Sequence, residues 1–208
     1  MKTVKVLGIL VFVFMLMFAV QAQADIVTYD LTVSNLSGVP GPYGTVSVNR
    51  TSGTTADVTF TRDDGFLFVD SNIGDLNVNG SYSASVSGLP NTPTIGSGQV
   101  DGFGFFNLTT DDPGVNNTDN ITSFVISLTD TSGTWSSASD VLINNADGYL
   151  AAAHIWSPTA NNPTGYAANG PSKVPEPAPV LLIGIGLAAL ALFGKSFSKK
   201  RKINLIVL

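Results

Sequence analysis

Apolar and polar residues alternate along much of the chain after residue 25. The pattern is clearest over residues 27–33, where apolar residues occupy every odd position and Thr or Asp every even one. Because successive side chains of a strand point to opposite faces, this period of two predicts a strand with one face on a core. The same alternation recurs at Val46 and Val48; Ala56, Val58 and Phe60; Leu76 and Val78; Tyr82, Ala84 and Val86; and Phe124, Ile126 and Leu128.

Turn residues separate these alternating stretches. Asp64-Gly65 and Asn79-Gly80 are typical of hairpin turns, and 40–42 and 89–93 are typical of longer, proline-containing connections. Short strands at this spacing predict an all-β domain over residues 25–160, an antiparallel β-sandwich of jelly-roll or immunoglobulin-like type. Its strand topology stays open.

The segment that follows changes in composition. Pro, Asn, Gly and Thr dominate from Pro158 onwards, with little alternation. We therefore expect residues 161–173 to be a linker between the β domain and the C-terminal segment.

The N-terminus has the pattern of a secretory signal peptide. Two lysines in the first five residues precede an apolar run at 6–20, and Ala22 and Ala24 supply small residues at positions −3 and −1 of a cleavage site. We expect signal peptidase to remove residues 1–24, so that the mature chain begins at Asp25. An uncleaved membrane anchor is the alternative.

A second apolar segment, residues 178–193, contains 16 residues without a charge. As a helix it would cover ~24 Å against a hydrocarbon core of ~30 Å, which predicts a short transmembrane helix. A buried core helix is the alternative. A basic cluster follows and favours the membrane, because such clusters stay on the cytoplasmic side. The cluster consists of Lys195, Lys199, Lys200, Arg201 and Lys202.

The C-terminal 30 residues combine three features in a fixed order. Val174, Pro175, Glu176 and Pro177 precede the apolar segment, which precedes the basic cluster. This arrangement over residues 174–202 resembles the PEP-CTERM sorting signal of Gram-negative bacteria. Two prolines keep the backbone around Glu176 extended, at a fixed height above the membrane. The apolar tail at 203–208 departs from the family pattern, which usually ends soon after the basic cluster.

The resemblance implies a destination and a partner. Chains of the PEP-CTERM family are recognised by an exosortase, a membrane-embedded transpeptidase-like enzyme, and they accompany exopolysaccharide production. We therefore expect an exported precursor that is anchored in the inner membrane and is then transferred to the cell surface or extracellular matrix. The stretches 44–48 and 147–155 are also similar to an uncharacterised ectodomain that recurs in this family, and that similarity implies no activity.

The charge distribution limits the partners. Residues 25–173 hold fourteen aspartates and three basic residues, a net charge of −11, so nucleic acid is not expected as a partner. The chain has no cysteine, which excludes disulfides, thiolate metal sites and a cysteine nucleophile. No cofactor is expected, with calcium as the alternative.

The calcium alternative depends on one loop. Asp111, Asp112 and Asp119 lie within nine residues that also contain two asparagines, and carboxylate and amide oxygens are the ligands that calcium takes. The spacing is not that of an EF-hand. The preferred interpretation is an ordinary β-loop, because such loops use the same residue types for their turns.

The single histidine gives the remaining functional candidates. If residues 151–156 form a strand, His154 and Trp156 share one face, and a Trp beside a polar group can stack on a sugar ring. The alternative is packing with one satisfied hydrogen bond. A serine hydrolase would need His154 as its base, but the chain has no Gly-x-Ser-x-Gly elbow.

Three functions therefore follow in order of preference. The first is an exported surface or matrix protein with no catalytic activity of its own. The second is a carbohydrate-binding module for exopolysaccharide, and the third is a hydrolase.

Overall fold

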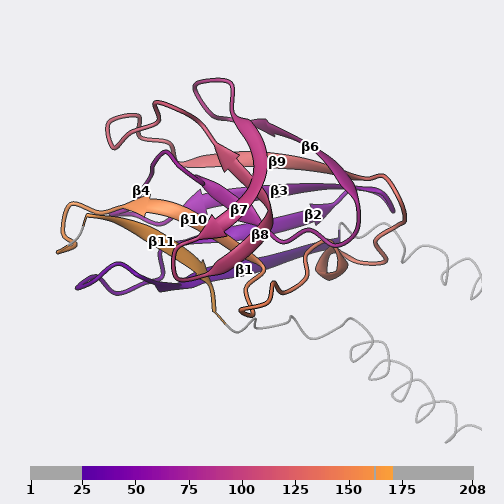
Figure 1. Cartoon of the computed structure of the whole chain (residues 1–208), viewed down its shortest axis with the longest axis horizontal. Helices are drawn as coiled ribbons and strands as arrows, with labels where there is room; N and C mark the ends of the chain where they lie inside the picture. The colour runs from indigo at the N-terminus through magenta and orange to yellow at the C-terminus, as the bar shows by residue number, and fades with distance from the viewer. Residues whose placement is uncertain (1–24, 162, 171–208) are drawn as a thin grey trace, which may run out of the picture. The chain divides into compact units, whose positions relative to one another are not determined.

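The computed structural model describes residues 25–161 and 163–170. Within them the chain forms eleven strands and one short 3-10 helix (Figure 1). These elements are β1 (Asp25–Ser34), β2 (Gly44–Arg50), β3 (Thr55–Arg62), β4 (Leu67–Phe68), β5 (Gly74–Leu76), β6 (Tyr82–Ser87), β7 (Thr94–Val100), β8 (Gly104–Asp111), β9 (Ser123–Asp130), η1 (Ala138–Asp140), β10 (Ala151–Trp156) and β11 (Thr164–Asn169).

All strands belong to one antiparallel sheet. Its order is β6-β9-β3-β2-β1-β11-β10-β5-β8-β7, with the short β4 paired to the end of β10. Four pairs join neighbours in sequence: β1 with β2, β2 with β3, β7 with β8, and β10 with β11. The first and last strands pair with each other in the middle of the sheet. The all-β, antiparallel class predicted from the alternation is confirmed.

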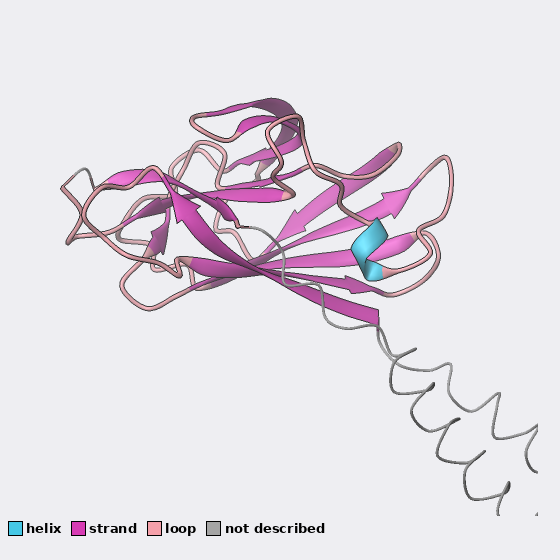
Figure 2. Ribbon diagram, turned by 90° about the horizontal axis from the view of Figure 1, so that it is seen from below, coloured by secondary structure: helices cyan, strands magenta, loops and turns pink. Residues whose placement is uncertain are grey.

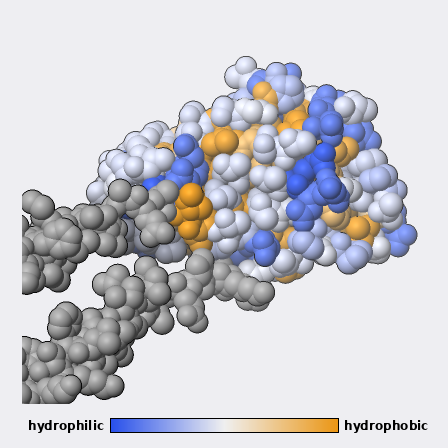
Figure 3. Space-filling model, turned by 180° about the vertical axis from the view of Figure 1, so that it is seen from behind, coloured by the Kyte–Doolittle hydropathy of each residue, from blue (hydrophilic) through white to orange (hydrophobic). Residues whose placement is uncertain are grey.

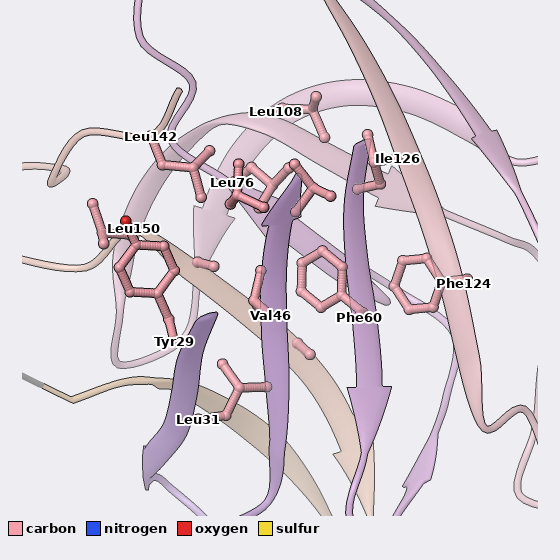
Figure 4. Packing of buried hydrophobic residues seen from close by; sticks show 14 of the residues in the cluster. Tyr29, Leu31, Val46, Phe60, Leu76, Leu108, Phe124, Ile126, Leu142 and Leu150 are labelled. Carbon is pink, nitrogen blue, oxygen red and sulfur yellow. The ribbon is translucent and has the colours of Figure 1, made fainter. Parts of the chain in front are cut away.

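The sheet curls so that its two halves face each other across one core (Figure 2). Side chains from β2, β3 and β9 on one half meet side chains from β5 and β8 on the other, as Figure 4 shows for Phe60, Ile126, Leu76 and Leu108. A hydrogen bond also links strands far apart in the sheet order, because the Tyr82 hydroxyl of β6 donates to a backbone carbonyl of β8 at 2.5 Å.

Aromatic rings fill the centre of this core. Phe60 and Phe124 stack with centroids 4.9 Å apart and an interplanar angle of 4°, and Phe68 meets Phe124 edge-on at 5.1 Å. Each ring is essentially buried, and burying such a side chain contributes about 1.5–3 kcal/mol. Gly74 faces Phe124 so closely that an added Cβ would lie 2.5 Å from the ring.

The predicted strands around residues 27–33, 46–48, 56–60, 82–86 and 124–128 are confirmed as parts of β1, β2, β3, β6 and β9. Their alternation has the expected cause, because the apolar positions face the core. The stretch at Leu76 and Val78 is shorter than expected. Leu76 ends β5, and Val78 makes only an isolated bridge to Leu142.

The two predicted hairpin turns are wrong as hairpins. Gly65 and Gly80 do have the positive φ angles, 91° and 86°, that tight turns require. However, the strands before and after each turn do not pair with each other: β3 pairs with β9 while β4 pairs with β10, and β5 pairs with β8 while β6 pairs with β9. A turn signal fixes the local backbone, whereas the pairing partner depends on the whole core.

The predicted linker at 161–173 is wrong over its central part. Residues 164–169 form β11, which lies between β1 and β10, and Ala167 and Ala168 are fully buried. Alternation is missing here because both faces of the strand are covered. The same holds for β10, where Ala151, Ala152 and Ala153 are all fully buried.

A second, smaller core covers the outer face of β10 and β11. Val100, Phe103 and Phe106 from the β7–β8 hairpin pack there against Ala152 and Ala168. The small alanine side chains allow the hairpin to approach closely. The β7–β8 register shifts between Gly96 and Gly98, which marks a β-bulge. Because of this bulge, Phe106 and Leu108 of β8 point to opposite faces of the sheet. Phe106 packs in the small core and Leu108 packs in the main core.

Candidate ligand-binding face

The candidate site lies on the outer face of β10 and β11, beside the small core. Residues 151–156 do form a strand, so His154 and Trp156 share the outer face, where both are half-buried. Ala153 and Ile155 point the other way and are fully buried in the main core. The expectation that His154 and Trp156 share one face of a strand, opposite Ala153 and Ile155, is therefore confirmed.

Tyr166 completes this aromatic surface. It is the register partner of His154, and the two rings stack with centroids 4.6 Å apart at an angle of 19°. Sequence reasoning missed Tyr166 because it lies in the segment expected to be a linker. The signal that could have found it is the Tyr of Gly165-Tyr166-Ala167-Ala168, since aromatic residues favour strands over linkers.

Both stacked rings donate to one turn. His154 Nδ1 forms a short hydrogen bond with the carbonyl oxygen of Asp70, so the proton of the ring lies on Nδ1. The Tyr166 hydroxyl donates to the next carbonyl, that of Ser71, at 3.1 Å. Burial is the main cause that raises the Tyr166 pKa to about 12, and the charge of Asp75 adds to it. Tyr166 therefore stays a neutral donor throughout the physiological range.

The turn that receives these bonds has an unusual backbone. Ser71 and Asn72 both have positive φ angles, 67° and 57°. This left-handed region costs a non-glycine residue about 1–2 kcal/mol, and such strain gathers at functional sites. The Asn72 amide donates to Asp111 Oδ1 at 2.5 Å, and the Ser71 amide donates to Asp70 Oδ1 at 2.6 Å. The turn is thus fixed from β8, β10 and β11 at once.

Asp75 on β5 lies on the outer side of the sheet as well, because its neighbours Gly74 and Leu76 face the main core. Its side chain is fully buried, and neither carboxylate oxygen has a hydrogen-bond partner among the described residues. Burial raises the pKa of Asp75 well above its ordinary value, and the nearby charge of Asp111 raises it further. Sequence reasoning missed Asp75, since an acidic residue beside Leu76 in an alternating pattern is expected to face solvent.

The structure separates the carboxylates of the loop that the sequence offered as a calcium alternative. Asp111 Oδ1 binds the Asn72 amide, Asp112 Oδ2 accepts from the Asn91 amide at 3.2 Å, and Asp119 Oδ2 accepts from a backbone amide of its own loop at 2.7 Å. Asp112 is fully buried, whereas Asp111 is partly exposed on the other face. Over 25–161 and 163–170, no three acidic, histidine or cysteine side chains come together to hold a metal ion.

His154 does not meet a serine in the manner of a hydrolase base. Its Nδ1 is bonded to a backbone carbonyl, and within the described residues no serine hydroxyl forms a hydrogen bond with its ring. The neighbouring ring face is occupied by Tyr166.

Asp25, the predicted first residue of the mature chain, begins β1. Its carboxylate accepts from the Ala138 amide at 2.6 Å and lies 3.6 Å from the Arg50 guanidinium. The other predicted processing residues lie outside the described part of the chain. They are Ala22, Ala24, Val174, Pro175, Glu176, Pro177, Lys195, Lys199, Lys200, Arg201 and Lys202.

Within residues 25–161 and 163–170, no helix has the length and apolar character needed to cross a bilayer. The predicted span at 178–193 lies outside that part. Comparison with protein-family models, curated proteins and solved structures found no match to this chain.

Proposed function

We propose that this chain is an exported protein of the cell surface or extracellular matrix, made as a precursor and processed by an exosortase. The support is that the described residues, 25–161 and 163–170, which lie between the predicted leader and the predicted sorting signal, pair all eleven of their strands in one sheet around a shared core. Asp25, the predicted first residue of the mature chain, also binds within this domain, because its carboxylate accepts from the Ala138 amide. Removing residues 1–24 and the segment after Val174 would remove none of these contacts.

The surface of the domain agrees with such a role. Exposed large apolar side chains are few among the described residues: Ile26, Val33, Ile95, Phe105 and Ile143. On the face drawn in Figure 3, hydrophobic spots are separated by polar surface and a strongly hydrophilic band. We propose that the curled sheet is a β-sandwich of jelly-roll or immunoglobulin-like kind, because its two halves enclose one core. Such a domain would act as a display or packing unit without chemistry of its own.

The mass of the mature protein tests the processing. In cells with an exosortase, we expect a product that starts at Asp25 and lacks the apolar segment 178–193, and in cells without the enzyme a product that retains this segment. A Glu176→Gln variant should lose part of the processing, whereas Asp30→Asn, at an exposed position of β1, should not. An intact C-terminal segment in both cell types would refute the proposal.

Carbohydrate binding is the second candidate, and the aromatic surface favours it. His154, Tyr166 and Trp156 lie together on one outer face, with the polar groups of the 70–72 turn beside them. A partly exposed aromatic face next to hydrogen-bonding groups suits the apolar and polar faces of a sugar ring.

Retention on immobilised exopolysaccharide tests the second candidate. Trp156→Ala should weaken retention of the full chain in nonionic detergent, because it removes a stacking surface. Phe105→Ala is the matched control, since Phe105 is an aromatic residue on β8 that is 52% exposed. Equal retention of the two variants and the unmodified chain would exclude sugar binding at this face.

A further inference from the structure

The side chain of Asp75 is buried on the face of β5 that points away from the main core. Its neighbours in β5, Gly74 and Leu76, both face the main core, so Asp75 points to the opposite face of the sheet. It is fully buried there, and both of its carboxylate oxygens lack a hydrogen-bond partner within the described residues. Burying a carboxyl group without a hydrogen-bond partner costs free energy, and a bound ion would offset that cost.

Basic side chains do not provide this partner. Residues 25–170 contain two, Arg50 and Arg62. Arg50 lies 3.6 Å from Asp25 and donates to the carbonyl oxygen of Trp135, at the η1 end of the domain. Arg62 donates to the carbonyl oxygen of Ile121 and lies 4.0 Å from an Asp64 oxygen. Both arginines are therefore engaged away from Asp75.

Asp111 brings a second carboxylate to the same face. Asp75 is opposite Thr109 in the register between β5 and β8, and Asp111 follows Thr109 by two residues, so all three share one face. Diagonal neighbours of this kind are about 7–8 Å apart, a separation that two carboxylates can bridge through an ion about 2.3–2.6 Å from each oxygen. Asp111 Oδ1 accepts from the Asn72 amide, which orients the group and leaves Oδ2 without a hydrogen bond among the described residues.

We propose that Asp75 and Asp111 hold a hard divalent cation, with calcium as the probe ion, between β5 and β8. The donor set consists of carboxylate oxygen atoms, which is the chemistry that calcium and magnesium take. Backbone carbonyls or water complete the coordination. With only two charged ligands, the affinity falls in the weak range of extracellular modules, a Kd of about 10⁻⁴–10⁻³ M.

The proposed site also explains the geometry of the strained turn. One oxygen of Asp111 accepts a hydrogen bond from the Asn72 amide, and the other would bind the cation. The Asp111 side chain therefore connects the cation to the left-handed Ser71–Asn72 backbone. The loop at Asp112 and Asp119 takes no part, because those carboxylates bind separate backbone amides. The proposed site therefore lies in the sheet and not in the loop that the sequence offered as the calcium alternative.

Terbium luminescence tests this site in the full chain, held in nonionic detergent and freed of metal with a chelator. Tyr166 is the antenna, because its hydroxyl donates to the Ser71 carbonyl of the turn whose Asn72 amide is bound by Asp111. We expect luminescence that rises with Tb³⁺ and is displaced by Ca²⁺. Asp75→Asn and Asp111→Asn should each weaken binding about tenfold or more. Asp119→Asn, the matched control, should leave it unchanged.

Two results would overturn the proposal. One is binding that survives in Asp75→Asn and Asp111→Asn but is lost in Asp119→Asn, which would return the site to the loop. The other is no saturable binding, which would leave Asp75 as a protonated, uncharged carboxyl group. The fluorescence of buried Trp135 checks that each variant is folded. If Asp75→Asn fails to fold, Asp111→Asn and Asp119→Asn together decide, because the sheet site requires loss of binding in the first and none in the second.

Discussion

Asn169 offers a direct test of β11, the strand in the segment that composition assigns to a linker. Its side chain is 4% exposed, and its Oδ1 accepts two backbone amides, from Leu150 at 2.7 Å and Ala151 at 3.0 Å. These two bonds join the end of β11 to the start of β10. Asn169→Ala removes the acceptor and leaves both buried amides without a partner.

The magnitude follows from the two amides. Each buried N–H that loses its partner costs about 1–3 kcal/mol, so we expect Asn169→Ala to lower the free energy of unfolding by about 3 kcal/mol. Domains of this size are stable by about 5–15 kcal/mol, so the loss is a large fraction of the total. If the segment were a linker, the same substitution would change stability by less than about 0.5 kcal/mol.

Denaturant unfolding of the full chain in nonionic detergent measures this change. Trp135 reports the transition, because it is 2% exposed and its indole N–H donates to the Asn79 carbonyl at 3.0 Å. Asn161→Ala is the matched control, since Asn161 is exposed and precedes β11 in the same predicted linker. Equal midpoints for Asn169→Ala and Asn161→Ala would refute the role given to β11.

Three further predictions concern other parts of the fold. Gly74→Ala should lower stability by about 1–3 kcal/mol, measured as a shift of the unfolding midpoint, because its Cβ would overlap the Phe124 ring; an unchanged midpoint would contradict the packing described. Tyr82→Phe removes the hydrogen bond between β6 and β8 and should cost about 1 kcal/mol in the same assay, and a neutral effect would argue against that contact. A hydrogen bond from the Ser136 hydroxyl is the main cause that lowers the pKa of Asp140 below 3.8. The stability that Asp140 contributes is therefore present above pH 3.8 and is lost as the pH falls through the pKa of the folded state. An NMR titration of Ser136→Ala should find the Asp140 pKa raised, and an unchanged pKa would show that the Ser136 hydroxyl is not the cause.

At the candidate site, the local sequence predicts the turn but not the side chains that bind it. The Asp70-Ser71-Asn72 sequence between Val69 and Ile73 is a turn signal in itself, because these polar residues favour turns and tolerate left-handed backbone. It does not reveal that β10 and β11, some 80 residues later in the chain, donate to that turn. Side-chain chemistry can be listed from a sequence, but its neighbours come from long-range strand pairing.

The sequence by itself determined the secondary-structure class and the positions of the strands β1, β2, β3, β6 and β9. Where a strand has one covered face, a period of two records that burial directly, as in 27–33 and 124–128. Only the tertiary structure decided the strands that are covered on both faces. In β10 and β11 the alternation disappears, because core contacts on one side and the β7–β8 hairpin on the other demand small buried residues at successive positions.

The tertiary structure alone also decided which strands pair and which carboxyl group is isolated. Turns at Gly65 and Gly80 follow from local backbone preference, but their flanking strands pair with strands from distant parts of the chain. Asp75 has the sequence context of a solvent-facing residue, yet it is fully buried on the face of β5 away from the main core. Local periodicity encodes which side of a strand is apolar, and the fold decides what lies against each side.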